Sequence, residues 1–241
     1  MQGFIYNNID SKIAEFLHEK GFKDGSRSFK LFSFSRINGN VDVVEVRGER
    51  FLFVKHNFSF ILSSPFEEFI ESFAMNLAKN NKKMYLGENE VSIYSVDVFF
   101  EPKFSESINI KMLSPITVYS TLTDSLGNKK TYYYNPWEKE FGELINSNLV
   151  KKINAFWNFL DNKRGFKLEN TCNGQGQGIS IKPVEVRKND EKIINYKGTV
   201  IKAWFGTYLL QGDSVLLKMA YDCGLGSKNS QGFGLFEVSS C

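Results

Sequence analysis

Cysteine is rare in this 241-residue sequence, and its three copies, Cys172, Cys223 and Cys241, lie far apart with no C-x-x-C pair. The spacing therefore predicts neither a disulfide framework nor a zinc site, and it fits a reducing cytoplasm. No run of apolar residues reaches the roughly 18 that a membrane-spanning helix needs, and no signal peptide opens the sequence. We therefore expect a cytoplasmic protein with no membrane partner.

An excess of one charge is also missing. The sequence carries 30 Lys+Arg against 27 Asp+Glu, a net charge of +3 at pH 7, which is well below the level at which composition alone indicates nucleic-acid binding. Any surface for a polyanion must therefore be local.

Histidine is scarce too, with only His18 and His56, and we interpret His56, in a Phe-rich strand region, as structural. The length suits two domains of ordinary size.

Glycine is concentrated near the C-terminal end of the sequence. Two Gly-hydrophobe-Gly triplets, at 224–226 and 232–234, flank a polar run that contains one lysine, Lys228. The stretch matches neither a Rossmann fingerprint nor a P-loop. Taken alone it favours a flexible, solvated hairpin, but glycines also allow close approach of a ligand, and successive exposed N–H groups can hold phosphate oxygens.

The first half of the sequence alternates short helices and strands. The predicted elements are helices at 2–9 and 11–20, strands at 27–34, 41–46 and 50–62, a helix from Ser64-Pro65, and strands at 83–86 and 90–100. Asp10 is a suitable cap for the second helix and Gly21 a suitable stop. An apolar stripe lines the third helix and indicates core: Phe66, Phe69, Ile70, Phe73 and Leu77.

The second half predicts the order β-α-β-β-α-β, which is that of a ferredoxin-like unit. The predicted elements are a strand at 108–121, a long helix from Asn135-Pro136 to about 161, strands at 179–187 and 193–210, a helix from Gly212-Asp213 to Tyr221, and a strand at 233–238; 165–178 is predicted to be loop. The first half has the same order without its first strand. We therefore predict an α+β fold of two tandem ferredoxin-like (RRM-like) domains, residues 1–104 and 105–241.

Five blocks along the chain carry a resemblance to a known family. They are Gly3-Phe4-Ile5-Tyr6-Asn7, Phe16-Leu17-His18-Glu19, Phe29-Lys30-Leu31-Phe32-Ser33, Leu113-Ser114-Pro115-Ile116, and Lys218-Met219 to Val238 around the glycine stretch. In this order they resemble the repeat-associated RNA-binding (RAMP) superfamily of CRISPR systems. Within it, the chain is similar to the sixth Cas family, the endoribonuclease that cuts precursor CRISPR RNA inside each repeat.

The resemblance implies a catalytic trio of Tyr6, His18 and Lys30, with no metal or other cofactor. RNA carries its own nucleophile, the 2′-hydroxyl, so cleavage needs in-line positioning, a base, an acid and a cation for the phosphorane charge. Histidine can act as base or acid near neutral pH, Tyr6 can position or protonate, and Lys30 can neutralise charge. The implied products are a 2′,3′-cyclic phosphate and a 5′-hydroxyl.

The sequence departs from the family at its start. The family normally has a β-strand ahead of the tyrosine helix, whereas this sequence begins almost at that helix. The first strand of a ferredoxin-like sheet is central, so we expect a gap between two other strands, with unpaired edges.

The implied partner is CRISPR repeat RNA, and a CRISPR effector complex and a second copy of the chain are further partners to consider. The predicted RNA contacts are Gly224, Gly226, Ser227, Lys228, Asn229, Ser230, Gly232 and Gly234, with Arg27, Arg187 and Lys202 as additional backbone contacts. Two alternatives stay open. One is a non-catalytic repeat-RNA-binding protein of the same superfamily, and the other is a regulatory module that binds no RNA, because fold does not fix function.

Overall fold

The structure is a computed structural model that describes residues 1–39, 43–47, 50–53, 57–79, 83–123, 127–164 and 178–239. The predicted loop at 165–178 falls almost entirely outside the described residues, as do His56, Cys172 and Cys241. Cys223 is a free, buried thiol, and burial raises its pKa to about 11. Among the described residues, no helix has both the length and the apolar character to cross a bilayer.

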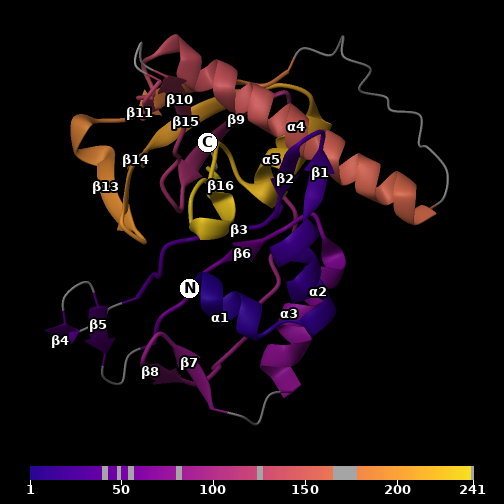
Figure 1. The fold of residues 1–241 in the computed structure, drawn as a ribbon, viewed down its shortest axis with the longest axis vertical. Helices are drawn as coiled ribbons and strands as arrows, with labels where there is room; N and C mark the ends of the chain where they lie inside the picture. Colours follow the sequence, from indigo (N-terminus) through magenta and orange to yellow (C-terminus); the bar gives the residue numbers. More distant parts are fainter. Residues whose placement is uncertain are drawn as a thin grey trace.

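Residues 1–104 form the lower part of the molecule in Figure 1, except for the β1–β2 hairpin, which extends up to α4. Its elements are α1 (Gln2–Asn7), α2 (Ser11–Glu15), the π-helical turn η1 (Phe16–Lys20), β1 (Phe22–Asp24), β2 (Arg27–Phe29), β3 (Ser33–Phe34), β4 (Val43–Arg47), β5 (Arg50–Phe53), β6 (Leu62–Ser63), α3 (Glu67–Lys79), β7 (Met84–Leu86) and β8 (Asn89–Val91). As predicted, the Asp10 side chain caps α2 by accepting the Lys12 N–H, at 2.9 Å. The predicted apolar stripe of α3 is confirmed as core, with Phe69 and Phe73 buried.

Several predictions for this half are wrong in detail. The strand predicted at 50–62 is divided, because β5 ends at Phe53 and β6 starts at Leu62. The helix predicted at 11–20 becomes π-helical from Phe16, where the Gly21 N–H reaches back to the Phe16 carbonyl at 2.7 Å. The strand predicted at 27–34 is interrupted because Leu31 adopts a left-handed conformation, with φ of 50°, which cannot continue a strand. β2 instead pairs with β1, and β3 pairs with β6.

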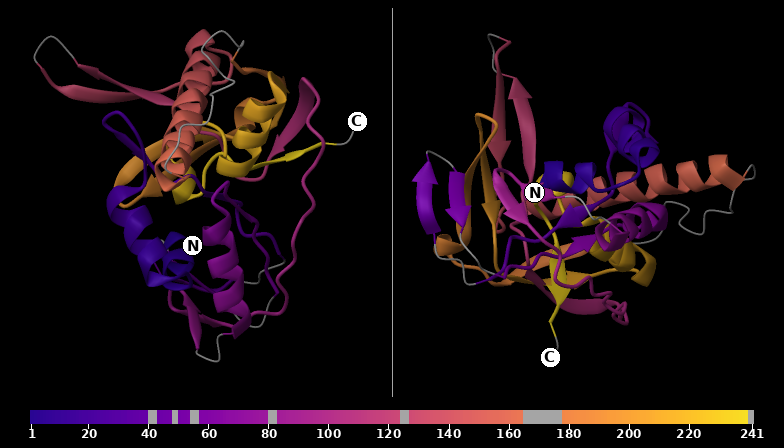
Figure 2. Two further views of the ribbon diagram at one scale, coloured as in Figure 1. Left: turned by 90° about the vertical axis from the view of Figure 1, so that its right-hand side faces the viewer. Right: turned by 90° about the horizontal axis from the view of Figure 1, so that it is seen from below.

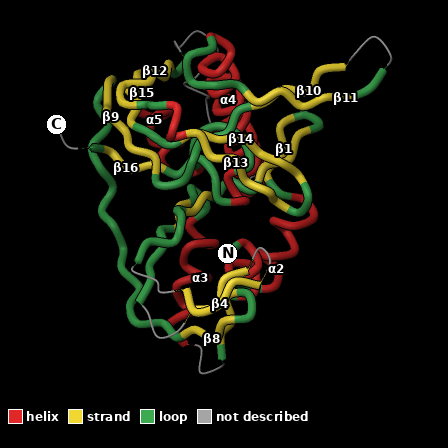
Figure 3. The backbone as a smooth tube through the Cα atoms, turned by 90° about the vertical axis from the view of Figure 1, so that its left-hand side faces the viewer, coloured by secondary structure: helices red, strands yellow, loops and turns green. Residues whose placement is uncertain are grey.

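The strand predicted at 90–100 ends at Val91. Residues 92–106 contain no strand and run along one side of the molecule to the upper half (Figures 2 and 3). Most of their apolar side chains face solvent, with Tyr94 93% and Phe100 99% exposed, although Ile93 and Phe104 pack against the core. A strand forms only beside a hydrogen-bonded neighbour. No described strand pairs with residues 92–106, and this segment accordingly forms no strand.

Residues 105–241 contain the predicted ferredoxin-like sheet. Their elements are β9 (Ser107–Met112), β10 (Tyr119–Thr123), β11 (Lys129–Tyr133), α4 (Lys139–Arg164), β12 (Ser180–Glu185), the 3₁₀ turn η2 (Lys188–Asp190), β13 (Glu191–Tyr196), β14 (Thr199–Trp204), β15 (Thr207–Gln211), α5 (Ser214–Cys223), the 3₁₀ turn η3 (Asn229–Gln231) and β16 (Phe236–Val238). The sheet order is β12-β15-β9-β16, with every pair antiparallel. The first and third strands are thus central, as the β-α-β-β-α-β prediction requires.

Two hairpins are inserted into this unit. The strand predicted at 108–121 joins β9 to β10 of the first hairpin, and the strand predicted at 193–210 joins the second hairpin, β13–β14, to β15. β10–β11 lies between β9 and α4 and projects from the body of the molecule (Figure 2). β13–β14 lies between β12 and β15, and its end reaches the first half, where the Tyr196 hydroxyl contacts Gln2 Oε1 at 2.7 Å.

A single apolar core continues from one half into the other. Phe22 of β1 packs against Phe66 and against Phe156 and Phe159 of α4, with ring centroids 5.4, 5.8 and 4.9 Å away. Helix α4 thereby lies across the β1–β2 hairpin of the first half. The α+β fold with ferredoxin-like elements is confirmed, while the boundary at 104/105 stays a prediction.

Candidate active site and glycine loop

Tyr6 and His18 lie side by side although they come from different helices. Their rings meet edge to face, with centroids 6.4 Å apart at an interplanar angle of 88°. Tyr6 is half-buried because its ring also packs on Phe32, at 6.1 Å. His18 is exposed, on a π-helical turn of the kind that is frequent at functional sites. The imidazole is therefore accessible to a substrate, with a phenol beside it.

Lys30 completes the group through the backbone of the histidine turn. Its Nζ donates hydrogen bonds to the carbonyl oxygens of Leu17 and His18, the second at 2.9 Å. A cation at a helix C-terminus is favourable because it meets carbonyls with no helical partner. Two of the three ammonium donors are used in this way, which leaves one for an external oxygen. The structure thus brings all three predicted catalytic residues together.

Burial shifts the proton affinities of two members of this group. It raises the pKa of Tyr6 to about 12 and lowers the pKa of Lys30, because partial desolvation disfavours the charged form of each. The Tyr6 phenol consequently keeps its proton throughout the neutral range. It can donate a hydrogen bond, but it cannot serve as a base there.

The glycine loop (residues 224–234) is not the flexible, solvated hairpin that its composition favours. All four of its glycines are buried and adopt positive φ. A Cβ at Gly224 would lie 2.9 Å from Ser33 Cβ, and one at Gly232 would lie 2.7 Å from the Phe34 ring. Both neighbours belong to β3, which starts three residues after Lys30. The loop is therefore a packed element that contacts the strand leading from the candidate active site.

Most backbone donors at the ends of the loop are also used internally. The N–H groups of Leu225, Ser227 and Gly234 bond to the carbonyls of Gly234, Thr117 and Pro115, at 2.9, 2.9 and 3.1 Å. The glycines thus allow close packing within the protein, which differs from the expected role of letting a ligand come close to the backbone. Ser227, Lys228 and Ser230 remain partly exposed, and RNA contact by the loop stays a prediction.

Asn229 has a role that sequence analysis did not foresee. Its side chain is buried, and its Nδ2 donates to the carbonyls of Leu225 and Phe233, at 2.9 and 3.0 Å. Its Oδ1 accepts a hydrogen bond from the buried Lys152 of α4, at 2.7 Å. Both polar atoms of the Asn229 side chain therefore have internal partners, and contact of Asn229 with RNA stays a prediction.

Lys152 itself was missed by sequence analysis. The signal for it was a lysine at a core position of the α4 stripe, at i+3 from Leu149 and i+7 from Ile145, both of which are buried. Lysine at such a position requires a buried partner set. The identity of that set depends on a loop more than 70 residues away in the sequence, so no local pattern reveals it.

The predicted cationic contacts separate into two groups. Lys228 lies with Nζ 5.1 Å from the centre of the Tyr119 ring, and burial lowers its pKa. Lys202 is close to the loop, because Thr117 donates to the Lys202 carbonyl at 2.8 Å and accepts from Ser227. Arg36, which sequence analysis missed, lies over Phe233 of the loop at 5.5 Å.

Arg27 and Arg187 belong to the second group. Arg27 is exposed on β2, and Arg187 caps η2, where its N–H bonds to Asp190 Oδ2 at 2.7 Å. Within the described parts of the chain, neither arginine has a hydrogen bond or ion pair to the glycine loop or to the catalytic trio. Their contact with RNA stays a prediction.

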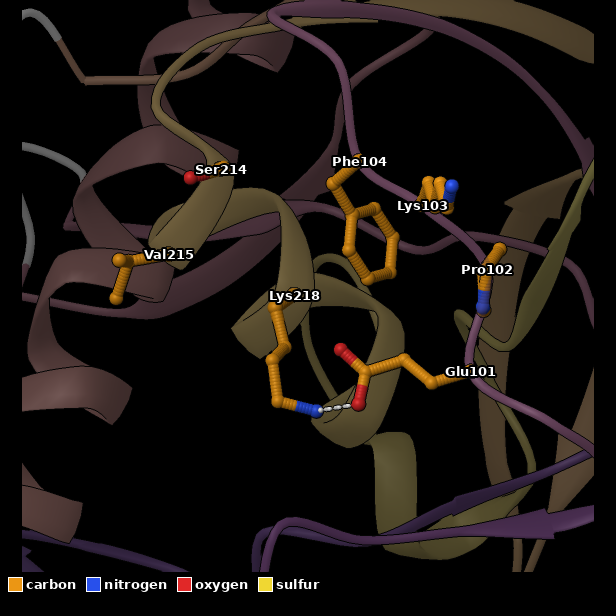
Figure 4. Close-up of a pocket in the computed structure, with 7 residues that line it drawn as sticks. All are labelled: Glu101, Pro102, Lys103, Phe104, Ser214, Val215 and Lys218. Carbon is orange, nitrogen blue, oxygen red and sulfur yellow. Dashed lines mark hydrogen bonds and ion pairs between the residues drawn. The ribbon is translucent and has the colours of Figure 1, made fainter.

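A separate hollow lies beside α5 and the segment that enters the second half (Figure 4). Its lining residues are Glu101, Pro102, Lys103, Phe104, Ser214, Val215 and Lys218. Lys218 Nζ donates to Glu101 at 2.7 Å across it. None of the predicted site residues lines this hollow. In the described ranges, no group of three or more His, Cys, Asp or Glu side chains is arranged to hold a metal ion.

Solved structures define the class of protein that this fold and site represent. One described as "CRISPR associated protein Cas6" matches with a TM-score of 0.72 and 25% identity, over 99% of this chain and 90% of that one. Another, described as "An RAMP protein binding different RNA substrates", shares the fold with a TM-score of 0.69 at 15% identity, over 99% and 90% of the two chains. The chain therefore has the ferredoxin-like fold that these two structures share.

The family follows from the sequence comparison. The family model "CRISPR associated protein Cas6, C-terminal" matches residues 99–238, which is more than half of the chain, so the chain belongs to the Cas6 family. It is 29% identical to "CRISPR-associated endoribonuclease Cas6 1" of Methanocaldococcus jannaschii, over 96% of this chain and 81% of the relative. It is 28% identical to "CRISPR-associated endoribonuclease Cas6" of Pyrococcus furiosus, over 99% and 80%.

Proposed function

We propose that this protein is an endoribonuclease that cleaves precursor CRISPR RNA within its repeats. The observation that carries the proposal is that the Tyr6 ring lies against the exposed imidazole of His18, while Lys30 Nζ binds backbone carbonyls of the same turn. The two curated relatives, which cover almost the whole chain, are both named endoribonucleases. The name of a RAMP structure with the same fold describes binding of RNA substrates, and this supports RNA as the substrate class.

The proposed reaction is attack of a ribose 2′-oxygen on the adjacent phosphorus. The new P–O2′ bond forms as the P–O5′ bond breaks, giving a 2′,3′-cyclic phosphate and a 5′-hydroxyl. One proton leaves the 2′-hydroxyl and one is taken up by the departing 5′-oxygen, so the step balances without an added reactant. His18 is the proposed carrier of a proton in this exchange, because imidazole accepts and donates protons near neutral pH.

Lys30 and Tyr6 supply stabilisation and position. The third N–H of the Lys30 ammonium is available for a non-bridging phosphate oxygen, which gains charge as the phosphorane forms. The two carbonyl contacts of Lys30 hold that donor next to the His18 turn. The protonated Tyr6 phenol orients the imidazole or donates to the scissile group. Lys228 of the glycine loop is the proposed contact to the RNA backbone, and such contacts fix register rather than sequence.

Cleavage of labelled repeat RNA in excess EDTA tests the proposed function. We expect one cut per repeat, a 5′-hydroxyl on the downstream product, and a 3′ end on the upstream product that resists phosphatase until acid opens the cyclic phosphate. RNA that is bound but stays intact would favour the non-catalytic RNA-binding protein. Absence of any gel shift at low salt would favour the regulatory module and would contradict both RNA hypotheses.

The pH dependence of a Tyr6→Phe variant tests the role of the phenol. The Tyr6→Phe variant lacks the hydrogen bond that the phenol donates to the imidazole or to the scissile group. Because that acceptor changes charge during the reaction, we expect cleavage to slow about tenfold. Because the pKa of Tyr6 is about 12 rather than its usual 10.0, the phenol stays protonated up to about pH 11. The ratio of wild-type to variant rate should therefore be constant from pH 6 to pH 10 in single-turnover assays.

A ratio that declines above pH 9 would show that the phenol ionises near its ordinary value, and it would contradict the buried, donating role. A ratio of one at every pH would remove Tyr6 from the catalytic group. Tyr85→Phe is a suitable control, because Tyr85 is exposed on β7 and has no hydrogen bond or ring contact with the trio among the described residues.

A further inference from the structure

Lys152 is a lysine inside the protein, only 3% exposed, at the centre of α4. Its Nζ donates to the Gly224 carbonyl at 2.8 Å, to the Gly226 carbonyl at 3.1 Å and to Asn229 Oδ1 at 2.7 Å. All three acceptors belong to the glycine loop. An ammonium group has three N–H donors whereas a neutral amine has two, so the three contacts match the charged form.

The charge is compensated by dipoles rather than by a carboxylate. None of the ion pairs among the described residues includes Lys152. Gly224 directly follows α5, and the C-terminal end of a helix carries partial negative charge. Burial lowers the pKa of Lys152, which shows the desolvation that the carbonyls must offset. A buried charge without such partners is strongly destabilising, so the loop and the ammonium depend on each other.

The contacts of Asn229 extend this arrangement to the other triplet of the loop. Asn229 accepts from Lys152 and donates to the carbonyls of Leu225 and Phe233. One ammonium and one amide thus hold both Gly-hydrophobe-Gly triplets from the inside. Lys228 precedes Asn229 and adopts a left-handed conformation, with φ of 62°. Its direction therefore depends on where Asn229 is held, and its Nζ lies over the Tyr119 ring.

We propose that Lys152 is a positioning residue for RNA binding, an internal cation around which the glycine loop folds so that Ser227, Lys228 and Ser230 are presented at the surface. This inference rests on the proposed function, since it assumes that the loop contacts RNA. Lys152 touches no substrate itself. It acts through Asn229 and through the carbonyls of Gly224 and Gly226, much as a bound cation would.

Chemical rescue distinguishes a positioning cation from a residue that only fills space. Lys152→Met keeps the apolar stem and removes the charge, and we expect the RNA dissociation constant to rise about ten- to a hundredfold, as for loss of hydrogen bonds to a charged group. Lys152→Ala leaves a cavity lined by the three oxygens. Ammonium chloride should restore RNA binding to this variant, whereas tetramethylammonium chloride at equal ionic strength should not, because it has no N–H donor.

The matched control is Lys151→Ala, which removes the same charge from the adjacent, partly exposed position of α4 and should not respond to the choice of salt. If a Lys152 variant is recovered unfolded, it is refolded in each salt, and recovery of RNA-binding protein in ammonium alone supports the proposal. Wild-type affinity in Lys152→Met, or equal rescue by the two salts, would overturn it. Wild-type protein that binds no RNA would instead contradict the proposed function.

Discussion

Replacing His18 by alanine is expected to slow repeat cleavage by about 10²–10⁴-fold, the usual contribution of general acid–base catalysis. RNA affinity should be unchanged, because the imidazole is exposed and makes its ring contact only with Tyr6 among the described aromatic residues. The fold should also be unaffected, since Lys30 bonds to the backbone carbonyl of residue 18 rather than to its side chain. Single-turnover rates and gel shifts on the same preparation separate the two quantities.

Glu19→Ala is the matched control for this variant. Glu19 is the exposed neighbour of His18 on the same π-helical turn, so its truncation perturbs the turn to a similar extent without removing an imidazole. We expect the control to cleave at the wild-type rate. Cleavage by His18→Ala at the wild-type rate would exclude the imidazole as proton carrier and would leave only an RNA-binding role for the site.

The parts of the fold that the sequence predicts well are those set by local patterns. The apolar stripe predicted for α3, with Phe69, Phe73 and Leu77 at helical spacing, is buried as expected. The order of elements in the second half predicts the antiparallel sheet correctly, because right-handed crossovers and short connections leave few other topologies. The inserted hairpins were merged with their neighbours since alternation alone does not show where a strand turns.

The failures arise where a distant partner decides the outcome. Residues 92–100 continue the alternation of a strand, yet they form none, because no described strand pairs with them. Leu31 interrupts a strand-like run, and its carbonyl accepts from the Ser64 hydroxyl at 2.7 Å. A lysine is unexpected at a core position of α4, and Lys152 can be explained only once its hydrogen-bond acceptors in the glycine loop are known. Such features follow from tertiary contacts and not from propensity.

The catalytic trio was placed by resemblance, and its convergence could not be derived from spacing. Tyr6, His18 and Lys30 are separated by twelve residues each, an interval far longer than the two to four residues over which a helix or a strand brings side chains together. What joins them is the packing of α1 on the histidine turn and the return of the chain through the β1–β2 hairpin. Composition draws attention to the glycine loop, but the structure shows that its glycines are required by close packing and positive φ.

Substitution of Gly234 by alanine is expected to be among the most destabilising changes of a single methyl group. Gly234 has φ of +79°, and a Cβ there would collide with the Leu225 carbonyl oxygen and lie 2.5 Å from Asn229 Nδ2. The backbone cannot easily move away, because the Gly234 N–H bonds to Pro115 at 3.1 Å and its carbonyl accepts from Leu225 at 2.9 Å. We expect a loss of about 3 kcal/mol or more in the free energy of unfolding.

Gly198 provides a closely matched control. It has the same φ of +79° in the β13–β14 turn, but nothing lies within 4 Å of the position that a Cβ would take. The free energy of unfolding of Gly198→Ala should therefore fall only by the cost of placing alanine in a left-handed conformation, about 1–2 kcal/mol. Urea unfolding of both variants, compared by midpoint at constant slope, isolates the steric contribution of the loop. Equal losses in the free energy of unfolding of the two variants would mean that the glycine loop can shift to accommodate a Cβ. A loop that shifts in this way could not hold Lys228 in one orientation.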